Sequence, residues 1–306
     1  MSVFSQIFAL FLMMGAGFIV RKKNLITDTG VSEMSRLLLY VTLPALIIKA
    51  MQFEIGVEEM MRGMKMPLLA LILYTVCIGL AFLTVRLMKL SGKQADVLRC
   101  CLIFPNVSFM GYPVVLSIYG EEGMFYAALF NMFFDLLIWT VGIAILSRSA
   151  DRKQKGKSAL ASILNPGTAG VLIGLSLFFF SIDLPVFISD TLTYLSRATV
   201  PIAMICIGAL LSQSSVSDVV GNKKLIFVSL VKMILFPLIV LLILKAAGMS
   251  GYFLTIPVIM MAMPSAANVA VFSAKLESDA VLASQGVFLT TLMSLVTIPV
   301  LVNWIR

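Results

Sequence analysis

The amino-acid sequence predicts an all-α polytopic membrane protein with ten transmembrane helices. Three observations lead to this fold class. First, 60% of the 306 residues are hydrophobic and only 12% are charged, whereas a soluble domain carries about 25% charged residues. Second, apolar stretches about 20 residues long, the length of a spanning helix, recur along the whole chain. Third, the loops between them are short, so we expect a multi-pass protein that lies in the lipid bilayer of the cell's inner (plasma) membrane.

Ten stretches are long and apolar enough to be candidate spans. They lie at about 3–21, 32–51, 66–88, 98–119, 123–147, 163–180, 186–211, 223–247, 252–275 and 279–304. The longest polar segment between them is the basic loop 148–158. This loop divides the chain into a first five-helix half, 1–147, and a second five-helix half, 159–306.

The distribution of Lys and Arg predicts the orientation, because cytoplasmic loops carry an excess of these residues. Most loop Lys and Arg residues follow the odd-numbered spans, with clusters at 21–23, 86–99 and 148–157. The bias places the loop 148–158 in the cytoplasm and both chain termini outside. The cluster at 21–23 follows the first apolar stretch, so we expect a retained span and not a signal peptide.

Two pairs of prolines indicate that the second half repeats the first. Pro44 and Pro201 lie in mid-span 157 residues apart, and Pro105 and Pro264 lie in mid-span 159 residues apart. Because each half has an odd number of spans, the second copy must enter the membrane from the opposite side. An inverted repeat of this kind is typical of secondary transporters. The alternative is a chance spacing among the 11 prolines of the chain.

The fourth and ninth spans contain the residues that break helices. The fourth reads FPNVSFMGYP, with Pro105, Asn106 and Ser108 near the middle, and the ninth breaks at Pro264 with Asn268 following. Proline removes a backbone donor and clashes with the preceding turn. Irregular backbone at membrane depth persists only where it is buried in protein or lines a cavity, so we interpret the two breaks as a binding site. A proline-kinked packing helix is the alternative.

These motifs resemble those of a known transporter family. FPNVSFMGYP resembles the helix-4 signature of the auxin efflux carrier family, and MPSAANVAVFSAK resembles the broken ninth helix of that family. The long cytoplasmic loop of many plant members is missing, which favours a bacterial-type relative. The resemblance implies an organic-acid substrate such as malate or malonate rather than auxin itself.

The resemblance also implies a fold and a mechanism. The family fold is two inverted five-helix repeats in which broken helices 4 and 9 cross at mid-membrane. Helices 3–5 and 8–10 are expected to carry the site past a scaffold of helices 1, 2, 6 and 7 in an elevator-type motion. Family members suggest a homodimer.

The candidate substrate-binding residues lie at the two breaks and on the fifth span. Half-helix N-termini carry partial positive charge and attract anions, and Asn side chains add amide donors without a fixed charge. By resemblance, Asn106 matches the family's substrate-binding asparagine, whereas Asn268 has the alternative role of capping local backbone. The full set is Pro105, Asn106, Ser108, Asn131, Asp135, Pro264, Ser265 and Asn268.

Asp135 is the only acid well inside a candidate span. Asn131 lies four residues earlier, one helical turn away on the same face. Intramembrane carboxylates are costly and usually functional. Our hypothesis is that Asp135 binds a proton that is transported together with an organic anion. The alternatives are that Asp135 pairs with a basic residue or binds a cationic substrate.

Two basic residues also lie inside candidate spans. Arg197 stands one turn before Pro201, where it either holds a substrate carboxylate or extends to the interface. Lys232 is about nine residues into the eighth span. It either pairs with Asp135, neutralises the binding site or extends to the interface. Asp135, Lys232 and Arg197 are therefore the candidates for proton coupling or charge pairing.

The composition also excludes several functions. The chain has no His, so His-based acid–base chemistry and His metal ligands are excluded, and the four Cys residues have no metal-type spacing. We expect no enzyme activity, no cofactor, no metal and no nucleic-acid partner, with H⁺ or Na⁺ as candidate coupling ions. The sequence therefore predicts a secondary transporter of small organic anions, either mono- or dicarboxylates or auxin-like acids. A channel for ions or solutes is the alternative.

Overall fold

The structure is a computed structural model that describes residues 3–52, 61, 63–149, 166–180, 182, 184–212, 219 and 221–305. The described residues form helices joined by short connections. The one strand-like feature among them is an isolated antiparallel bridge between Pro105 and Ser265. The prediction of an all-α chain is therefore confirmed for the described residues. Most of the basic loop 148–158 lies outside them.

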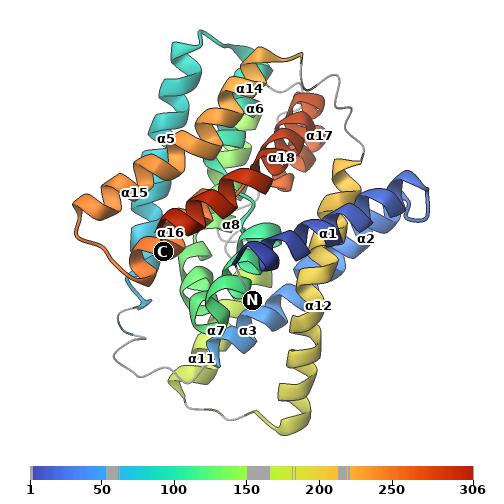
Figure 1. Cartoon of the computed structure of the whole chain (residues 1–306), viewed down its shortest axis with the longest axis vertical. Helices are drawn as coiled ribbons and strands as arrows, with labels where there is room; N and C mark the ends of the chain where they lie inside the picture. The colour runs from blue at the N-terminus through green and yellow to red at the C-terminus, as the bar shows by residue number, and fades with distance from the viewer. Residues whose placement is uncertain are drawn as a thin grey trace. The chain divides into compact units, whose positions relative to one another are not determined.

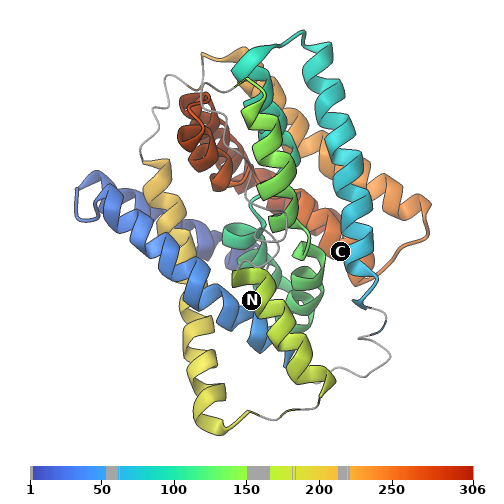
Figure 2. The same cartoon turned by 180° about the vertical axis from the view of Figure 1, so that it is seen from behind.

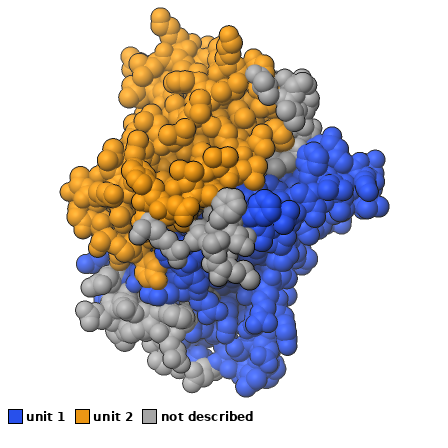
Figure 3. Space-filling view, in the orientation of Figure 1, with its two compact units in different colours: residues 1–67, 108–132, 163–213 blue, residues 68–107, 133–162, 214–306 orange. Residues whose placement is uncertain are grey.

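The contacts within the chain group it into two compact units, coloured separately in Figure 3. Unit 1 comprises residues 1–67, 108–132 and 163–213. Unit 2 comprises residues 68–107, 133–162 and 214–306. Both units take segments from both halves of the sequence.

Within the described residues, unit 1 contains six helices and two π-helical segments. They are α1 (Val3–Lys22), α2 (Asp28–Leu37), η1 (Leu38–Thr42), α3 (Leu43–Met51), η2 (Val107–Gly111, whose first residue belongs to unit 2), α7 (Tyr112–Asn131), α11 (Pro166–Phe179) and α12 (Val186–Leu211). The first helix, α1, packs along α12 (Figure 1). In the view from behind, α3 and α11 lie side by side (Figure 2).

Glycines allow α1 and α12 to approach closely. A Cβ atom on Gly208 of α12 would lie 1.8 Å from the carbonyl oxygen of Met14, and one on Gly17 of α1 would lie 2.2 Å from that of Ile205. No real Cβ tolerates such distances, so both positions require glycine. Small residues at helix crossings are the usual means of close packing in membranes.

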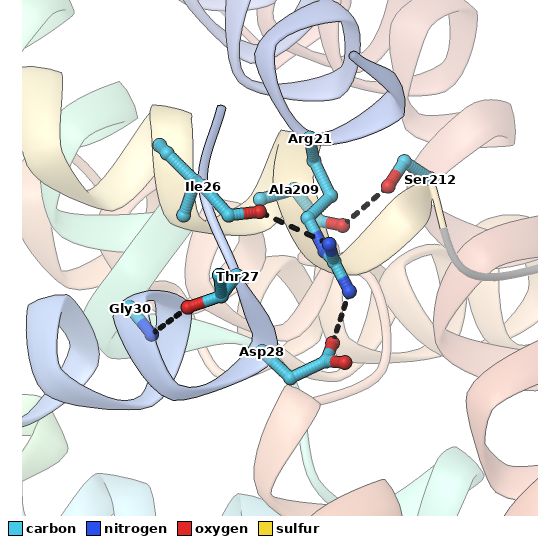
Figure 4. Close-up of polar contacts among 7 residues, drawn as sticks. All are labelled: Arg21, Ile26, Thr27, Asp28, Gly30, Ala209 and Ser212. Carbon is cyan, nitrogen blue, oxygen red and sulfur yellow. Dashed lines mark hydrogen bonds and ion pairs between the residues drawn. The ribbon is translucent and has the colours of Figure 1, made fainter. Parts of the chain in front are cut away.

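Polar contacts fix the connection between α1 and α2 (Figure 4). Arg21, in the last turn of α1, forms an ion pair with Asp28 at 2.5 Å and donates to the carbonyl of Ile26 at 3.0 Å. Thr27 caps α2, because its Oγ1 accepts from the backbone N–H of Gly30 at 3.1 Å. Asp28 stands in the first turn of α2, where a negative charge is favoured by the helix dipole.

Unit 2 holds the remaining helices and two π-helical segments. They are α5 (Met66–Leu87), α6 (Gly92–Ile103), α8 (Phe134–Leu137), η3 (Ile138–Gly142), α9 (Ile143–Ser147), α14 (Lys223–Leu230), η4 (Val231–Leu235), α15 (Phe236–Ala246), α16 (Tyr252–Met261), α17 (Ala267–Lys275) and α18 (Ala280–Ile305). Helix α18 packs against both α6 and α17, and α15 packs against α16.

Three π-helical segments each end two residues before a proline. The segments η1, η2 (Val107–Gly111) and η4 precede Pro44, Pro113 and Pro237. Proline has no N–H to donate to the carbonyl four residues earlier, and its ring clashes with that carbonyl. A local change to i→i+5 hydrogen bonding accommodates this defect while the helix continues.

Five described helical stretches are long and apolar enough to cross a membrane. They are Asp28–Lys49, Met66–Leu87, Val186–Ala209, Lys223–Ala246 and Ala280–Ile305. They coincide with the second, third, seventh, eighth and tenth predicted spans. The ninth predicted span is broken, as its sequence indicated, into α16 and α17.

The fourth predicted span is interrupted around Pro105 and Asn106, as its sequence indicated, whereas the fifth differs from the prediction. Helix α6 ends at Ile103, and the chain resumes helical structure at Val107. Gly120 lies within α7 but has φ 66° and ψ −158°, a conformation that favours glycine. A further turn at Met132–Phe133 separates α7 from α8. The fifth span is therefore not one continuous helix.

Candidate functional site

The two broken helices meet in unit 2 through a pair of backbone hydrogen bonds. The N–H of Asn106 donates to the carbonyl of Pro264 at 2.6 Å, and the N–H of Ala266 donates to the carbonyl of Phe104 at 2.9 Å. These bonds form the antiparallel bridge between Pro105 and Ser265. Each break thus supplies partners for backbone groups that the other leaves without a helical partner.

Side chains satisfy carbonyls at the broken end of α6. The hydroxyl of Ser265 donates to the carbonyl of Cys101 at 2.8 Å. The ammonium of Lys232, from η4, donates to the carbonyl of Leu102 at 2.9 Å. The last carbonyls of a helix have no partner within it, so these two donors stabilise the end of α6 where the chain breaks.

Thr290 of α18 holds the second break in place and is not among the site residues predicted from the sequence. Its Oγ1 accepts from the backbone N–H of Ser265 at 3.0 Å and donates to the carbonyl of Gly286 at 2.7 Å. The repeat offset of 159 residues was a usable signal, because it relates Asn131 to Thr290 and Asp135 to Ser294. The polar positions of the fifth span therefore have polar counterparts in the tenth.

Asn106 is the most distinctive polar residue of the site. It is 3% exposed, and its side-chain Nδ2 has no hydrogen-bond partner among the described residues. A buried donor without a partner costs about 1–3 kcal/mol. Asn106 therefore presents an amide donor that a ligand could satisfy.

The other predicted residues of the second break differ in their roles. Pro264 and Ser265 are buried, and both contribute to the bridge or its support. Asn268 is half-buried in the first turn of α17, and its side chain makes no hydrogen bond to another described residue. The first N–H groups of α17 carry the partial positive charge of a helix N-terminus.

Ser108 and Asn131 both belong to unit 1. Ser108 is half-buried within η2. Asn131 is buried at the end of α7, and its Oδ1 has no hydrogen-bond partner among the described residues. A turn at 132–133 separates α7 from α8, so Asn131 and Asp135 do not lie on one uninterrupted helix; that the two share one face stays a prediction. The backbone of Asp135 lies in α8, but its side chain lies outside what the structure describes.

The two predicted basic residues occupy different environments. Lys232 is 1% exposed, so its ammonium is buried and does not extend to an interface. Arg197 is exposed on α12 and lines a cavity of about 310 Å³ in unit 1, together with Lys49 and Glu121. No ion pair joins these three residues within the described part of the chain.

Apolar helices of spanning length and a pair of mutually bonded broken helices define a polytopic helical membrane protein. Comparison with known proteins identifies its family. The model of the family described as "Membrane transport protein" matches residues 2–302. The chain belongs to this family, that of the auxin efflux carriers, and the resemblance of the two broken-helix motifs is confirmed.

Several relatives match along most of their length. An uncharacterized transporter of Methanocaldococcus jannaschii is 26% identical over 301 residues, which cover 94% of each chain. An uncharacterized transporter of Methanothermobacter thermautotrophicus is 26% identical over 284 residues, 92% of each chain. A protein of Rhizobium meliloti, provisionally named a malonate transporter, is 23% identical over 279 residues, 89% of this chain and 86% of the relative.

Proposed function

We propose that the protein is a secondary transporter of small organic anions that bind at the paired breaks of the fourth and ninth spans. The observation that carries this proposal is the buried amide of Asn106, which lacks a partner among the described residues and is part of the bridge between the breaks. The provisional name of the Rhizobium meliloti relative makes malonate the first substrate to test.

The chemistry of the site favours a small carboxylate. Amide N–H groups and helix N-termini donate to an anion without placing a full charge beside it. A carboxylate held in this way is easier to release than one held by a bidentate arginine. Fast release suits a carrier, which must bind and discharge its substrate in every cycle.

The proposal includes an inverted repeat, and two contacts support it. The hydroxyl of Thr199 donates to the carbonyl of Thr42 at 2.9 Å, and these residues are 157 apart. The bridged residues Pro105 and Ser265 are 160 apart. Residues related by a repeat touch their own counterparts only near the axis that relates the two copies. The near-equal separations therefore favour a two-fold relation within each unit.

We further propose that unit 2 carries the substrate relative to unit 1 in an elevator-type motion. Unit 1 contains the first, second, sixth and seventh predicted spans, and unit 2 contains the third, eighth, ninth and tenth. The family resemblance implies a scaffold of helices 1, 2, 6 and 7 and a transport bundle of helices 3–5 and 8–10, so these eight spans divide in the same way. Residues 108–132, which belong to the fourth and fifth predicted spans, are the exception, because they fall in unit 1. Both termini outside the membrane, a homodimer and symport with H⁺ remain parts of this proposal.

Uptake of labelled malonate into proteoliposomes tests the function. A carrier shows saturable uptake and accelerated exchange when unlabelled malonate is trapped inside. Asn106→Ala removes the unpartnered amide and is expected to abolish both effects. Asn303→Ala, an exposed change near the end of α18, is the matched control and should leave them unchanged. Equal uptake by the Asn106→Ala variant would reject this site, and uptake without exchange would indicate a channel.

A further inference from the structure

Lys232 is a buried cation at the negative end of a half-helix. It is 1% exposed, and its Nζ lies 2.9 Å from the carbonyl oxygen of Leu102 and 5.9 Å from the centroid of the Phe236 ring. Leu102 stands in the last turn of α6, one residue before the helix ends. The C-terminal carbonyls of a helix carry a partial negative charge, so the ammonium lies where a cation is favoured.

Three other carbonyls at this break accept from neutral donors. The carbonyl of Cys100 accepts from the N–H of Phe104 at 3.0 Å, that of Cys101 from the hydroxyl of Ser265, and that of Phe104 from the N–H of Ala266. Lys232 is therefore the one donor with a full charge at the described end of α6. Among the described side chains, the titratable groups that face it from neighbouring helices are the thiols of Cys77 and Cys101.

In transporters with broken helices, unwound carbonyls and half-helix C-terminal ends are the groups that coordinate Na⁺ or H⁺. A lysine whose ammonium donates to such a carbonyl places a positive charge at the same position, and this charge is covalently attached to the protein. The charge is then present in every transport cycle and cannot exchange with ions in solution. A negative substrate at the break benefits from it without any bound metal ion.

We propose that Lys232 is a built-in cation that takes the place of a soluble coupling cation at the C-terminal end of α6. The anion of the proposed function binds near this charge, so this inference rests on that function. Two consequences follow. Substrate binding is independent of Na⁺ in the native protein, and removal of the ammonium creates a vacancy that a small cation from solution can fill.

Lys232→Ala tests the proposal by chemical rescue. The thermal midpoint of the purified variant, without any substrate, is measured in N-methylglucamine chloride and again with propylammonium, ammonium or Na⁺ at equal ionic strength. We expect propylammonium, which matches the deleted stem and charge, to raise the midpoint of the variant but not that of the wild type. Lys245→Ala changes an exposed lysine at the end of α15 and should show no rescue.

The same variants are then tested for malonate binding. The affinity of Lys232→Ala should fall by about tenfold, which corresponds to about 1.4 kcal/mol, because the anion loses a nearby positive charge, and propylammonium should restore it. Lys232→Met preserves the packing of the stem and should show the same loss without rescue. It also serves if the alanine variant does not fold.

The outcomes separate this proposal from the function on which it rests. If malonate stabilises neither the wild type nor the variants but the amine stabilises Lys232→Ala, the cation site stands and the substrate assignment fails. If malonate binds and neither Lys232 variant loses affinity, the proposal is overturned. A folded Lys232→Ala protein that no cation stabilises would also overturn it, because the ammonium would then have only a packing role.

Discussion

Thr290→Val removes the side-chain acceptor that, among the described residues, bonds the second break to α18. The backbone N–H of Ser265 donates to Thr290 Oγ1 at 3.0 Å, and both residues are buried, with 0% and 2% exposure. Valine has nearly the same shape but no oxygen. The N–H of Ser265 then has no acceptor and no access to water, so the second break loses one of the hydrogen bonds that hold it.

The expected loss of unfolding free energy depends on the kind of group that loses its hydrogen-bond partner. A buried donor left without its partner costs about 1–3 kcal/mol. A hydrogen bond that merely replaces bonds to water on folding contributes only about 1 kcal/mol. The neighbouring Thr291 is equally buried, at 1% exposure, but its hydroxyl donates only to the carbonyl of Val287 in its own helix, at 2.7 Å. That carbonyl keeps its backbone partner in Thr291→Val. We expect this control to cost about 1 kcal/mol or less, the net contribution of one intramolecular hydrogen bond.

Equilibrium unfolding in mixed micelles, with increasing SDS and far-ultraviolet circular dichroism as the signal, measures both variants. Because the two changes replace the same hydroxyl group with a methyl group at adjacent buried positions, their difference isolates the lost acceptor of the Ser265 N–H. The reasoning predicts that Thr290→Val is less stable than Thr291→Val by about 1–3 kcal/mol. Equal stabilities, or a greater loss in Thr291→Val, would refute it.

Three further changes test other parts of the account. Gly208→Ala places a Cβ 1.8 Å from the Met14 carbonyl and should cost about 3 kcal/mol or more in unfolding free energy, or prevent folding. Gly15→Ala, with nothing within 4 Å, should lie within about 0.5 kcal/mol of the wild type; equal effects would contradict the close packing of α1 and α12. Asp135→Asn should abolish malonate uptake driven by a pH gradient while exchange persists, and unchanged coupled uptake would reject Asp135 as the proton carrier. A disulfide engineered to fix unit 1 to unit 2 should stop uptake, and continued uptake would exclude the elevator motion.

Much of the site's backbone could be predicted because its signals are local. Pro105 and Pro264 each interrupt an apolar stretch, and a missing N–H has the same consequence wherever the stretch packs. The structure breaks both helices at these prolines. The positions of Asn106 and Asn268 near the breaks followed directly from the sequence.

Other features depend on partners far away in the sequence. Lys232 was visible as a charge in mid-span, but its acceptor, the Leu102 carbonyl, is 130 residues distant, and nothing in either local sequence indicates the pairing. The turn after Asn131 was missed because it contains neither proline nor glycine. Thr290 resembles the other threonines of α18 until the position of Ser265 is known.

The central claim is that a small organic anion binds at the bridged breaks and satisfies the amide of Asn106. The most direct test is the thermal midpoint of the purified wild type and of Asn106→Ala with a panel of small organic acids, malonate included. A bound ligand stabilises the folded protein by RT ln(1 + [L]/Kd), which is about 2.7 kcal/mol at a hundredfold excess over Kd. We expect at least one mono- or dicarboxylate to raise the midpoint of the wild type, and we expect Asn106→Ala to lose this shift. Stabilisation by amines in place of acids, or an equal shift in both proteins, would contradict it.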